Sequence, residues 1–380
     1  MKKPKLLIVG AFAFLNNDPK KREIYGGVLK STQILMESHI QEKYKIIPID
    51  SSQISIPPPG LLIRFFYSLK RILIIITKLI KDKPHAALIF SADGLSAIEK
   101  GFMVVLCRVF GCKTMIFPRA GNLIHQLHKS SFMFVLIRFL YSHASFFLCQ
   151  GNKWKEFALK EFGFKESRVI VINNWTATAE LIDIGNKRSY ENEDTAKVLF
   201  LGWLEEFKGI FELLDASKAL LSMGIDFHLS LAGRGKAEKL AKKFVKDNGM
   251  SDKVTFLGWV EKDSLGELLK KNNIFVLPSY SEGFPNAMIE AMASGLTVVV
   301  SSVGMVPDYL KNEQEALLVK PKDRESLEKA LKKVITNTEL RNKLALAGQN
   351  LAYREFSSTN AISQLEKVID KCISKHRSRK

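Results

Sequence analysis

Short apolar runs alternate with longer amphipathic stretches along the whole chain. In the first half, aliphatic and β-branched residues gather at 6–9, 45–48, 86–90, 114–117, 146–149 and 169–172. A second series begins at 197–201 and continues at 227–231, 254–257, 274–277, 297–300 and 316–319. Short apolar runs separated by stretches long enough for helices are typical of buried strands in βαβ units. The pattern therefore predicts an α/β protein with two doubly wound parallel sheets.

A polar segment between the two series marks the expected boundary between two domains. Residues 176–196 include Glu191-Asn192-Glu193-Asp194 and lack a sustained apolar period, which favours a linker. A chain of 380 residues is also long enough to bury two cores. We therefore expect an N-terminal domain at 1–175, this linker, a C-terminal domain at 197–356 and a basic amphipathic helix at 357–380.

The charge of the chain is distributed unevenly. The formal net charge is +18, and residues 1–150 hold 21 Lys and Arg against 8 Asp and Glu, which is +13 and leaves +5 for the rest. This imbalance indicates an acidic partner for the N-terminal half, and both nucleic acid and an anionic membrane surface qualify on charge. Nucleic acid is disfavoured, because the basic residues lie among aliphatic ones and no known nucleic-acid-binding motif is present.

The stretch from Leu61 to Lys83 is apolar but interrupted by charge. Its basic residues are Arg64, Lys70, Arg71, Lys78 and Lys81. That is too many charges for a transmembrane helix. On a helical wheel its large apolar side chains form one broad stripe, which we expect to face the core. The stripe consists of Leu62, Phe65, Phe66, Leu69, Leu73, Ile76 and Ile80.

The opposite side of this helix supports two interpretations. Arg64, Arg71 and Lys78 recur there every seven residues, among Ile74 and other apolar side chains. Such a face is either a solvated basic face or a helix lying on an anionic bilayer. A second apolar helix is expected at 131–147, where it would belong to the core.

The cysteines favour a reducing compartment. The chain has four, Cys107, Cys112, Cys149 and Cys372, with neither zinc-binding nor disulfide-framework spacing. The basic and apolar N-terminus resembles a short signal peptide but lacks a small-residue cleavage site, so a first strand is favoured. We expect a cytoplasmic protein, attached peripherally to the inner face of the cytoplasmic membrane if the helix at 61–83 binds lipid.

The stretch from Pro278 to Gly295 separates the fourth and fifth apolar runs of the second series, so it must be a loop that turns into a helix. Pro285 suits the first helical position and Gly295 the residue just past the helix end. The first amides of the helix, from Asn286 onward, would then point out of its N-terminus. Backbone donors and the helix dipole favour a bound phosphate there.

Two glutamates flank this helix mouth, Glu282 in the loop and Glu290 about a turn and a half inside the helix. A carboxylate repels phosphate, so both make sense as acceptors for hydroxyl groups on the molecule that carries it. Their spacing, with Gly283, Phe284, Pro285 and Asn286 between them, resembles the signature of the family 4 retaining glycosyltransferases. The resemblance implies that Glu282 contacts the donor sugar, Glu290 the ribose of the nucleotide, and the intervening residues the rest of the donor.

The same resemblance implies the GT-B fold. This fold has two Rossmann-like domains that face a cleft, with a C-terminal helix packing back on the N-terminal domain. The donor would bind to the C-terminal domain, and the acceptor would enter from the N-terminal side.

Lys208 and Gly209 match a further part of the family pattern, in which an Arg and a Lys neutralise the donor diphosphate. Trp203 stands where the Arg is expected. Because the diphosphate gains charge as it leaves, a cation beside it stabilises the transition state directly. Arg234 and Arg119 are the candidates to replace the missing cation, and Val260 resembles the lining of the nucleotide base pocket.

The N-terminal half offers further candidates. Gly26 and Gly27 lie where a helix begins, and the resemblance places such a pair near the donor phosphate. Arg119 follows the fourth strand at its carboxyl end, the usual place of binding loops. Many family members carry a His in this area. His125 and His128 are the nearest here, and we expect both within the following helix, so neither matches the family position residue for residue. Of the two, His125 is the candidate catalytic residue.

These features predict a metal-independent, retaining glycosyltransferase that moves a sugar from a nucleotide diphosphate sugar to a glycan or lipid-linked acceptor, in cell-surface polysaccharide biosynthesis. No Asp-x-Asp pattern for a metal-bridged diphosphate is present, and no cofactor is expected. Two alternatives stay open. Trp203 and the unmatched His fit a non-catalytic subunit that binds sugar or membrane, and a GT-B-like nucleotide-sugar epimerase is the nearest enzymatic one.

Overall fold

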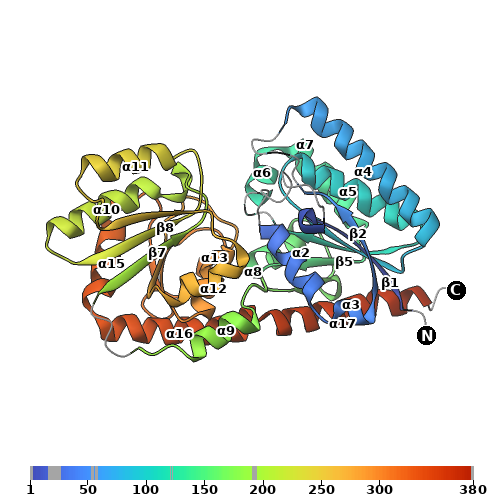
Figure 1. The fold of residues 1–380 in the computed structure, drawn as a ribbon. Helices are drawn as coiled ribbons and strands as arrows, with labels where there is room; N and C mark the ends of the chain where they lie inside the picture. Colours follow the sequence, from blue (N-terminus) through green and yellow to red (C-terminus); the bar gives the residue numbers. More distant parts are fainter. Residues whose placement is uncertain are drawn as a thin grey trace. The chain divides into compact units, whose positions relative to one another are not determined.

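The computed structural model contains two compact units, each built on one parallel sheet (Figure 1). The first unit comprises residues 1–175 and 359–380, and the second comprises residues 176–358. The structure describes residues 3–15, 27–52, 55, 59–119, 121, 123–190 and 195–377.

The sheet of the first unit has six strands in the order β2-β1-β3-β4-β5-β6. The strands are β1 (Lys5–Gly10), β2 (Lys45–Asp50), β3 (Ala86–Ser91), β4 (Lys113–Pro118), β5 (Phe146–Cys149) and β6 (Val169–Val171). All neighbouring pairs are parallel, and β1, β3, β4 and β5 are buried along almost their whole length. Such burial is typical of parallel strands covered on both faces, and the six strands predicted for the first half are confirmed.

Three helices share a hydrophobic core with one face of this sheet. They are α2 (Gly27–Glu37), α3 (Ile40–Lys43) and α17 (Ser358–Arg377). Leu365 and Ile369 of α17 belong to the same buried cluster as Leu6 and Phe90 of the strands. The predicted return of the C-terminal helix to the N-terminal domain is therefore confirmed.

The remaining helices of the unit include three that lie side by side, with α5 in contact with both others (Figure 1). These are α4 (Leu61–Asp82), α5 (Leu95–Val109) and α7 (Ser131–Ser142). The unit also contains α6 (Leu123–Lys129), α8 (Asn152–Lys160) and two 3-10 turns, Ala13–Leu15 and Glu166–Arg168.

Helix α4 buries a different face from the one we expected. Its buried apolar residues are Ile75 and Leu79, whereas six members of the predicted core stripe are exposed. These are Leu62, Phe65, Phe66, Leu69, Leu73 and Ile80. The reason lies in Arg71, predicted on the solvent side, which turns inward to pair with the buried Glu99 of α5.

Helix α7 also differs from its predicted core role. Phe132, Val135 and Phe139 are exposed, and only Ile137, Leu140 and Tyr141 are buried. In the part of the chain that the structure describes, no helix has the length and the apolar content that crossing a bilayer requires.

The second unit contains a six-stranded parallel sheet in the order β12-β11-β10-β7-β8-β9. Its strands are β7 (Ala196–Leu201), β8 (Phe227–Ala232), β9 (Val254–Gly258), β10 (Ile274–Leu277), β11 (Thr297–Ser301) and β12 (Leu317–Val319). They match the second predicted series. The helices are α9 (Ala179–Asn186), α10 (Ile210–Ser222), α11 (Glu238–Asp247), α12 (Lys262–Lys270), α13 (Asn286–Ala293), α14 (Val306–Tyr309), α15 (Arg324–Thr336) and α16 (Thr338–Phe356), with a 3-10 turn at Glu206–Lys208.

The segment predicted as a linker packs within the second unit. It contains α9, which buries Leu181 and Ile184 and contacts α12 and α13. Arg188 then donates hydrogen bonds to the carbonyl oxygens of Ser294 (3.0 Å), Asn272 (2.9 Å) and Leu269 (2.6 Å). A short apolar helix and one arginine thus attach this segment to the second unit. Residues 191–194, the most acidic part of the prediction, lie outside the described residues.

All four cysteines are buried free thiols. Burial raises the pKa of the Cys149 thiol well above its usual value, so this side chain stays protonated at neutral pH.

Candidate functional site

The order of the strands in the second sheet reverses between β7 and β10. The two strands are neighbours in the sheet, but the chain leaves β7 toward β8 and β9, and leaves β10 toward β11 and β12. At such a reversal of strand order the connections diverge and open a crevice at the carboxyl ends of the strands. The loops after β7 and β10 carry Lys208 and Glu282, the two residues that the sequence motifs predicted to act together.

Backbone contacts hold these two loops against each other. The amide of Tyr280 donates to the carbonyl oxygen of Phe207 at 2.8 Å. Gly209 has a φ of 74°, and a Cβ at this position would lie 2.2 Å from the carbonyl oxygen of Pro278. Only glycine allows this approach, so Gly209 both permits the left-handed turn and lets Lys208 reach the second loop.

Lys208 and Glu282 form an ion pair, with the ammonium on Oε1 of the carboxylate. Their side chains are 15% and 13% exposed. The hydroxyl of the buried Ser279 donates to the same Oε1 at 2.8 Å. Two donors from two loops therefore fix one carboxylate oxygen.

Helix α13 begins directly behind this pair. Pro285 is the N-cap residue, with an extended backbone (ψ 122°), and Asn286 is the first helical residue, so the proline lies one position earlier than predicted. The first turn of a helix leaves amides without acceptors inside the helix, and this N-terminus opens beside the loop of Glu282. Gly295, with a φ of 74°, follows the last turn as predicted. Glu290 lies within the helix and is 5% exposed.

A glycine after β11 packs closely against the backbone of the loop that leads into α13. Gly304 has a φ of 61°, and a Cβ there would lie 2.2 Å from the carbonyl oxygen of Glu282 and 2.5 Å from that of Gly283. The next amide, of Met305, donates to the Gly283 oxygen at 2.9 Å. The backbone around Glu282 is thereby held from both sides, by Gly304 and by the loop of Gly209.

Aromatic packing fixes the loop further. Phe284 is nearly buried, and its ring centre lies 5.0 Å from those of both Tyr309 of α14 and Phe356 at the end of α16, with the rings tilted by 47° and 48°. Phe284 was predicted as a donor-binding residue, and the structure places its ring in this hydrophobic cluster. Its contribution to a ligand site is therefore to position the backbone of Gly283 and Pro285.

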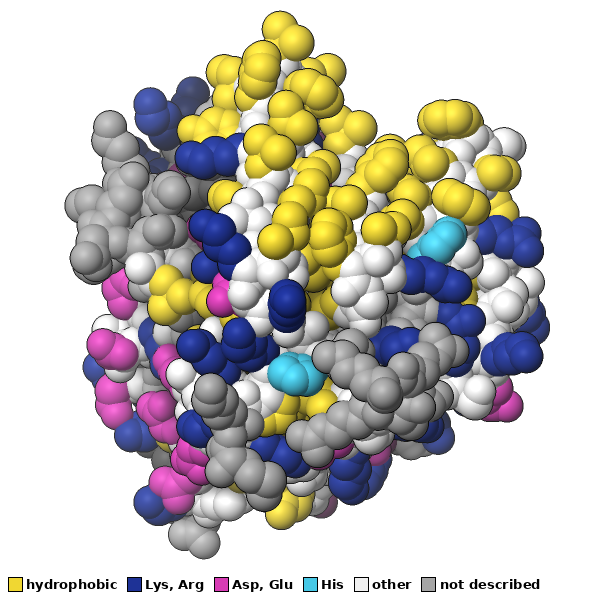
Figure 2. Space-filling model, turned by 90° about the vertical axis from the view of Figure 1, so that its right-hand side faces the viewer, with side chains coloured by type: hydrophobic (Ala, Val, Ile, Leu, Met, Phe, Trp, Pro, Cys, Tyr) yellow, Lys and Arg dark blue, Asp and Glu magenta, His cyan; other side chains and the backbone are white. Residues whose placement is uncertain are grey.

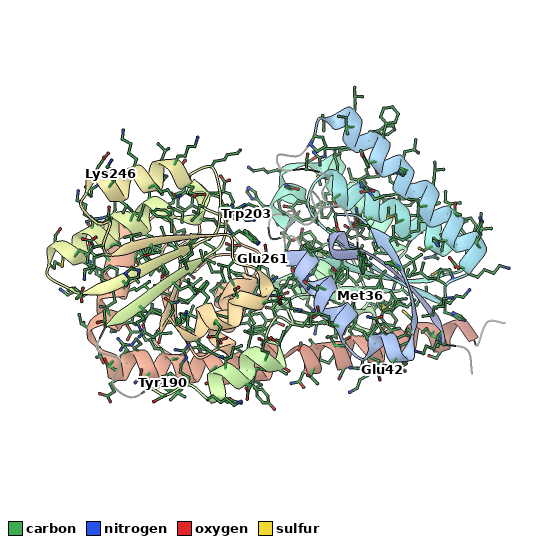
Figure 3. All side chains as sticks on the ribbon, in the orientation of Figure 1. Met36, Glu42, Tyr190, Trp203, Lys246 and Glu261 are labelled. Atoms are coloured by element: carbon green, nitrogen blue, oxygen red, sulfur yellow. The ribbon has the colours of Figure 1, made fainter. Side chains whose placement is uncertain are left out.

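Trp203 lies in the loop after β7 and is labelled in Figure 3. Its ring is 5.5 Å from that of Trp259, at an interplanar angle of 44°. The amide of Leu204 donates to the carbonyl oxygen of Arg234 at 2.9 Å, so the loops of Trp203 and Arg234 run together. The Arg234 side chain is exposed, and Val260, one residue past Trp259, is half-buried.

One polar group in this region was missed from the sequence. Tyr280 donates its hydroxyl to Glu212 of α10 at 2.5 Å, and the ammonium of Lys322 lies 4.8 Å from the centre of the Tyr280 ring. Burial and the hydrogen bond to Glu212 raise the pKa of Tyr280, so the phenol stays protonated. Its place two residues before Glu282 was the available signal, but Glu212 and Lys322 are remote in sequence.

In the first unit, Arg119 lies beneath two aromatic rings. Its guanidinium is 4.9 Å from the ring centre of Phe117 and 4.8 Å from that of Trp175, and Nη2 donates to the hydroxyl of Ser31 at 2.6 Å. Within the described part of the chain, its buried Nη1 has no hydrogen-bond partner. Burial lowers the pKa of Arg119 to about 9, which leaves it charged at neutral pH.

The other predicted residues of the first unit are placed less fully. Gly26 lies outside the described residues, and Gly27 is the first residue of α2 and is exposed. His125 lies in α6 and is exposed, and His128 of the same helix pairs with Glu161 at 3.0 Å. Both histidines are therefore in the helix after the fourth strand, as the sequence predicted.

No group of three or more His, Cys, Asp or Glu side chains within the described ranges is arranged to hold a metal ion. Lys208 is a cation at the mouth of α13.

Comparison with protein families and with curated relatives points in one direction. Residues 183–351 match the family model described as glycosyl transferases group 1. The chain is 31% identical over 222 residues to an uncharacterized glycosyltransferase of Methanocaldococcus jannaschii, covering 56% of this chain and 57% of that protein. It is 28% identical over 211 residues to a lipopolysaccharide core biosynthesis glycosyltransferase of Rhizobium meliloti, covering 54% and 60%. The chain thus spans less than two thirds of the length of these relatives.

A solved structure resembles the chain over nearly its whole length. A glycosyltransferase from Rickettsia africae superposes with a TM-score of 0.73 at 15% identity, covering 98% of this chain and 99% of that one. Together with the two parallel sheets, this likeness confirms the predicted GT-B fold with two Rossmann-like domains.

Proposed function

We propose that this protein, whose residues 183–351 match the family model of glycosyl transferases group 1, is a retaining glycosyltransferase. It moves a sugar from a nucleotide diphosphate sugar to a glycan or lipid-linked acceptor. The observation that carries the proposal is the pairing of Lys208 with Glu282 at the N-terminus of α13, where the order of the strands reverses. A cation, a helix N-terminus and a hydroxyl acceptor meet there, and these are the groups that a sugar diphosphate requires.

Lys208 is assigned to the diphosphate. An ammonium carries three N–H donors, and the contact with Glu282 uses one of them. The others are available to a phosphate oxygen beside the first amides of α13. Negative charge grows on the diphosphate as the glycosidic bond breaks, so a cation held there in advance lowers the barrier.

Glu282 is assigned two tasks. Its carboxylate fixes the position of Lys208, and it accepts hydrogen bonds from hydroxyl groups of the donor sugar. Glu290 is assigned to the ribose, and the backbone from Gly283 to Asn286 contributes donors to the diphosphate. The loop is already held by Ser279 and Gly304, so little conformational entropy is lost when the donor binds.

Val260 and Arg234 complete the proposed donor site of the second unit. Val260 would contact the nucleotide base. Arg234 lies on the loop next to Trp203 and has an exposed side chain, so it can supply the cation that Trp203 does not. In the first unit, Gly26, Gly27 and Arg119 are proposed as ligand-binding residues, and the proposal gives His125 no catalytic step.

For retention, the acceptor hydroxyl attacks the anomeric carbon on the face from which the diphosphate departs. The bond from this carbon to the diphosphate oxygen breaks as the new glycosidic bond forms. The acceptor proton passes to a diphosphate oxygen, so no protein base and no metal ion is needed. Glu282 orients the sugar throughout and forms no covalent bond.

Cell-surface polysaccharide biosynthesis is the proposed setting. One of the relatives is a lipopolysaccharide core biosynthesis glycosyltransferase. The four buried free thiols favour the cytoplasm, and the positive charge of residues 1–150 favours peripheral attachment to the inner face of the cytoplasmic membrane.

Incubation with a panel of UDP-, GDP- and ADP-sugars tests this function. We expect slow hydrolysis of one donor, with the released sugar keeping its anomeric configuration by NMR. If the donor is isomerised and its sugar is neither released nor transferred, the protein is an epimerase instead. Silence across the panel, with no thermal shift from any nucleotide, would favour a non-catalytic subunit.

A further inference from the structure

The first unit presents an apolar surface to solvent along α4. Leu62, Phe65 and Phe66 are 76%, 63% and 65% exposed, and Leu69 and Leu73 continue the stripe along the helix. Single exposed apolar side chains are ordinary, but a contiguous stripe of this size on one helix marks an interaction site.

A buried ion cluster holds α4 in this orientation. Glu99 of α5 is 6% exposed and accepts from Nε of Arg71 at 2.6 Å, and the 3% exposed Lys100 lies 2.7 Å from its other oxygen. Burial alone would raise the pKa of Glu99, but the charges of Lys100 and Arg71 outweigh burial and hold it below its usual value. Turning the apolar stripe of α4 inward would remove Arg71 from a buried carboxylate, which is strongly unfavourable.

The neighbouring helices extend this stripe into a surface. Phe132, Val135 and Phe139 of α7 are exposed, as are Phe102 and Val109 of α5. Because α5 contacts both α4 and α7, the exposed side chains of the three helices share one side of the unit. Figure 2 shows hydrophobic side chains gathered in rows on the face turned to the viewer, with Lys and Arg beside them. We call the exposed apolar side chains of α4, α5 and α7 the apolar surface.

The fully exposed charges on these three helices are all positive. The exposed ones are Arg64, Lys70, Lys81, Arg108 and Arg138. The helices carry two carboxylates, and neither is fully exposed: Glu99 is buried, and Asp82 pairs with Lys78 at 3.4 Å. Apolar and aromatic side chains bordered by cations are the features of a protein that lies in the interface of an anionic bilayer.

We propose that the apolar surface docks the first unit onto an anionic lipid bilayer. The aromatic and aliphatic side chains of α4 and α7 enter the boundary between headgroups and acyl chains, and the exposed cations that flank the stripe of α4, Lys70 and Lys81, contact lipid phosphates. A second copy of this chain is a poorer occupant, because a symmetric dimer through this surface would bring the cations of one copy against those of the other. The inference deepens the proposed location at the membrane, and it does not depend on sugar transfer.

Vesicle flotation tests the docking. Wild-type protein should float with vesicles of phosphatidylcholine and phosphatidylglycerol, less with phosphatidylcholine alone, and less as salt is added. The double variant Phe65→Ser/Phe132→Ser should bind anionic vesicles at least about tenfold more weakly for each aromatic side chain removed. Lys70→Gln and Lys81→Gln should each weaken binding about fivefold and flatten the salt dependence.

The control variant is Leu240→Ser/Leu346→Ser, which removes two apolar side chains, 61% and 46% exposed, from the second unit. It should float like wild type. Because all substituted residues are exposed, thermal midpoints should stay close to that of wild type. Glu282→Gln should still float, which separates docking from the proposed transfer reaction.

Three outcomes would overturn the proposal. If wild-type protein floats with neither kind of vesicle, the apolar surface does not bind lipid. Equal flotation of Phe65→Ser/Phe132→Ser and wild type would place docking elsewhere. A concentration-dependent dimer in analytical ultracentrifugation that dissociates in this double variant would assign the apolar surface to a second copy of the chain.

Discussion

Each unit contains a carboxylate held by a lysine, and the two clusters differ in how fully they are satisfied. In the first unit, Arg71 contacts both oxygens of Glu99, at 2.6 and 3.2 Å, and Lys100 joins the second at 2.7 Å. In the second unit, Lys208 and Ser279 converge on one oxygen of Glu282. The first cluster is locked between two helices, whereas the second lies between two loops at a helix N-terminus.

Both clusters pair a glutamate with a lysine, but the Glu99 cluster serves the stability of the fold and the Glu282 pair serves the proposed function. Glu99 has its charge compensated inside the fold, and its effect is to orient α4. Glu282 and Lys208 lie where strand order reverses, on loops shaped by Gly209 and Gly304. We therefore expect changes at Glu99 to alter the free energy of unfolding, and changes at Glu282 to alter catalysis.

The largest stability effect should come from Glu99→Gln. Without the carboxylate, the buried ammonium of Lys100 loses its partner, and the loss of one member of a buried pair costs about 3–5 kcal/mol of unfolding free energy. Urea unfolding followed by circular dichroism measures it. Asp82→Asn, which breaks the more exposed pair with Lys78, should cost less than about 1 kcal/mol. An equal loss of unfolding free energy in Glu99→Gln and Asp82→Asn would show that the Glu99 cluster does not hold α4 in place.

Glu282→Gln should reduce catalysis and leave stability nearly unchanged, the opposite of what we expect for Glu99→Gln. We expect the rate of donor turnover to fall about 10²- to 10³-fold, by analogy with the loss of one group that stabilises charge in a transition state. The thermal midpoint should change little, because the loop is also held by Phe284 and Gly304. Glu325→Gln, on an exposed side chain of the same unit, should turn over like wild type. A stable, fully active Glu282→Gln protein would remove Glu282 from the site.

Gly304→Ala should perturb the loop of Glu282 from behind. Its Cβ would meet two carbonyl oxygens at 2.2 and 2.5 Å, whereas Gly249, which also has a positive φ, has open space around its Cβ position. Both alanines carry a backbone penalty of about 1–2 kcal/mol, and only Gly304→Ala adds the steric clash. Differential scanning calorimetry should therefore rank Gly304→Ala below Gly249→Ala. Donor affinity should fall in Gly304→Ala and not in Gly249→Ala. Equal stability and equal donor affinity of the two variants would show that Gly304 does not position the loop of Glu282.

The smallest expected effect is a pH dependence. The pKa of Glu99 is lower in the folded protein than its usual value of about 4.3. Its contribution to stability is therefore full above the unfolded pKa and is lost as the pH falls through the folded pKa. Unfolding free energies measured between pH 6 and pH 3 (roughly the range that brackets carboxyl titration) should fall more steeply for wild type than for Glu99→Gln. Parallel curves would contradict this assignment.

The sequence was most informative where local rules decide the structure. Apolar runs bounded by turn residues located all twelve strands of the described residues, and Pro285 and Gly295 bracket α13 to within one residue. Lys208 and Glu282 lie 74 positions apart, but each follows a strand, and the carboxyl ends of neighbouring parallel strands bring such residues together.

The sequence was least informative where a partner distant in the chain decides. The apolar stripe of α4 is a valid core face by periodicity, and only the buried Glu99, 28 positions after Arg71, shows that the other face is inside. The region around 176–190 was predicted as part of a linker because it lacks a sustained apolar period, yet Arg188 ties it to three carbonyl groups. Neither partner is visible from local pattern.

The central claim is that Lys208 stabilises the departing diphosphate at the mouth of α13. Its most direct test is the rate at which Lys208→Ala hydrolyses the preferred nucleotide sugar, measured beside wild type and Lys332→Ala, whose lysine is exposed on α15. We predict a loss of about 10²-fold or more in Lys208→Ala and wild-type rates in Lys332→Ala. Equal rates in all three proteins would contradict the account.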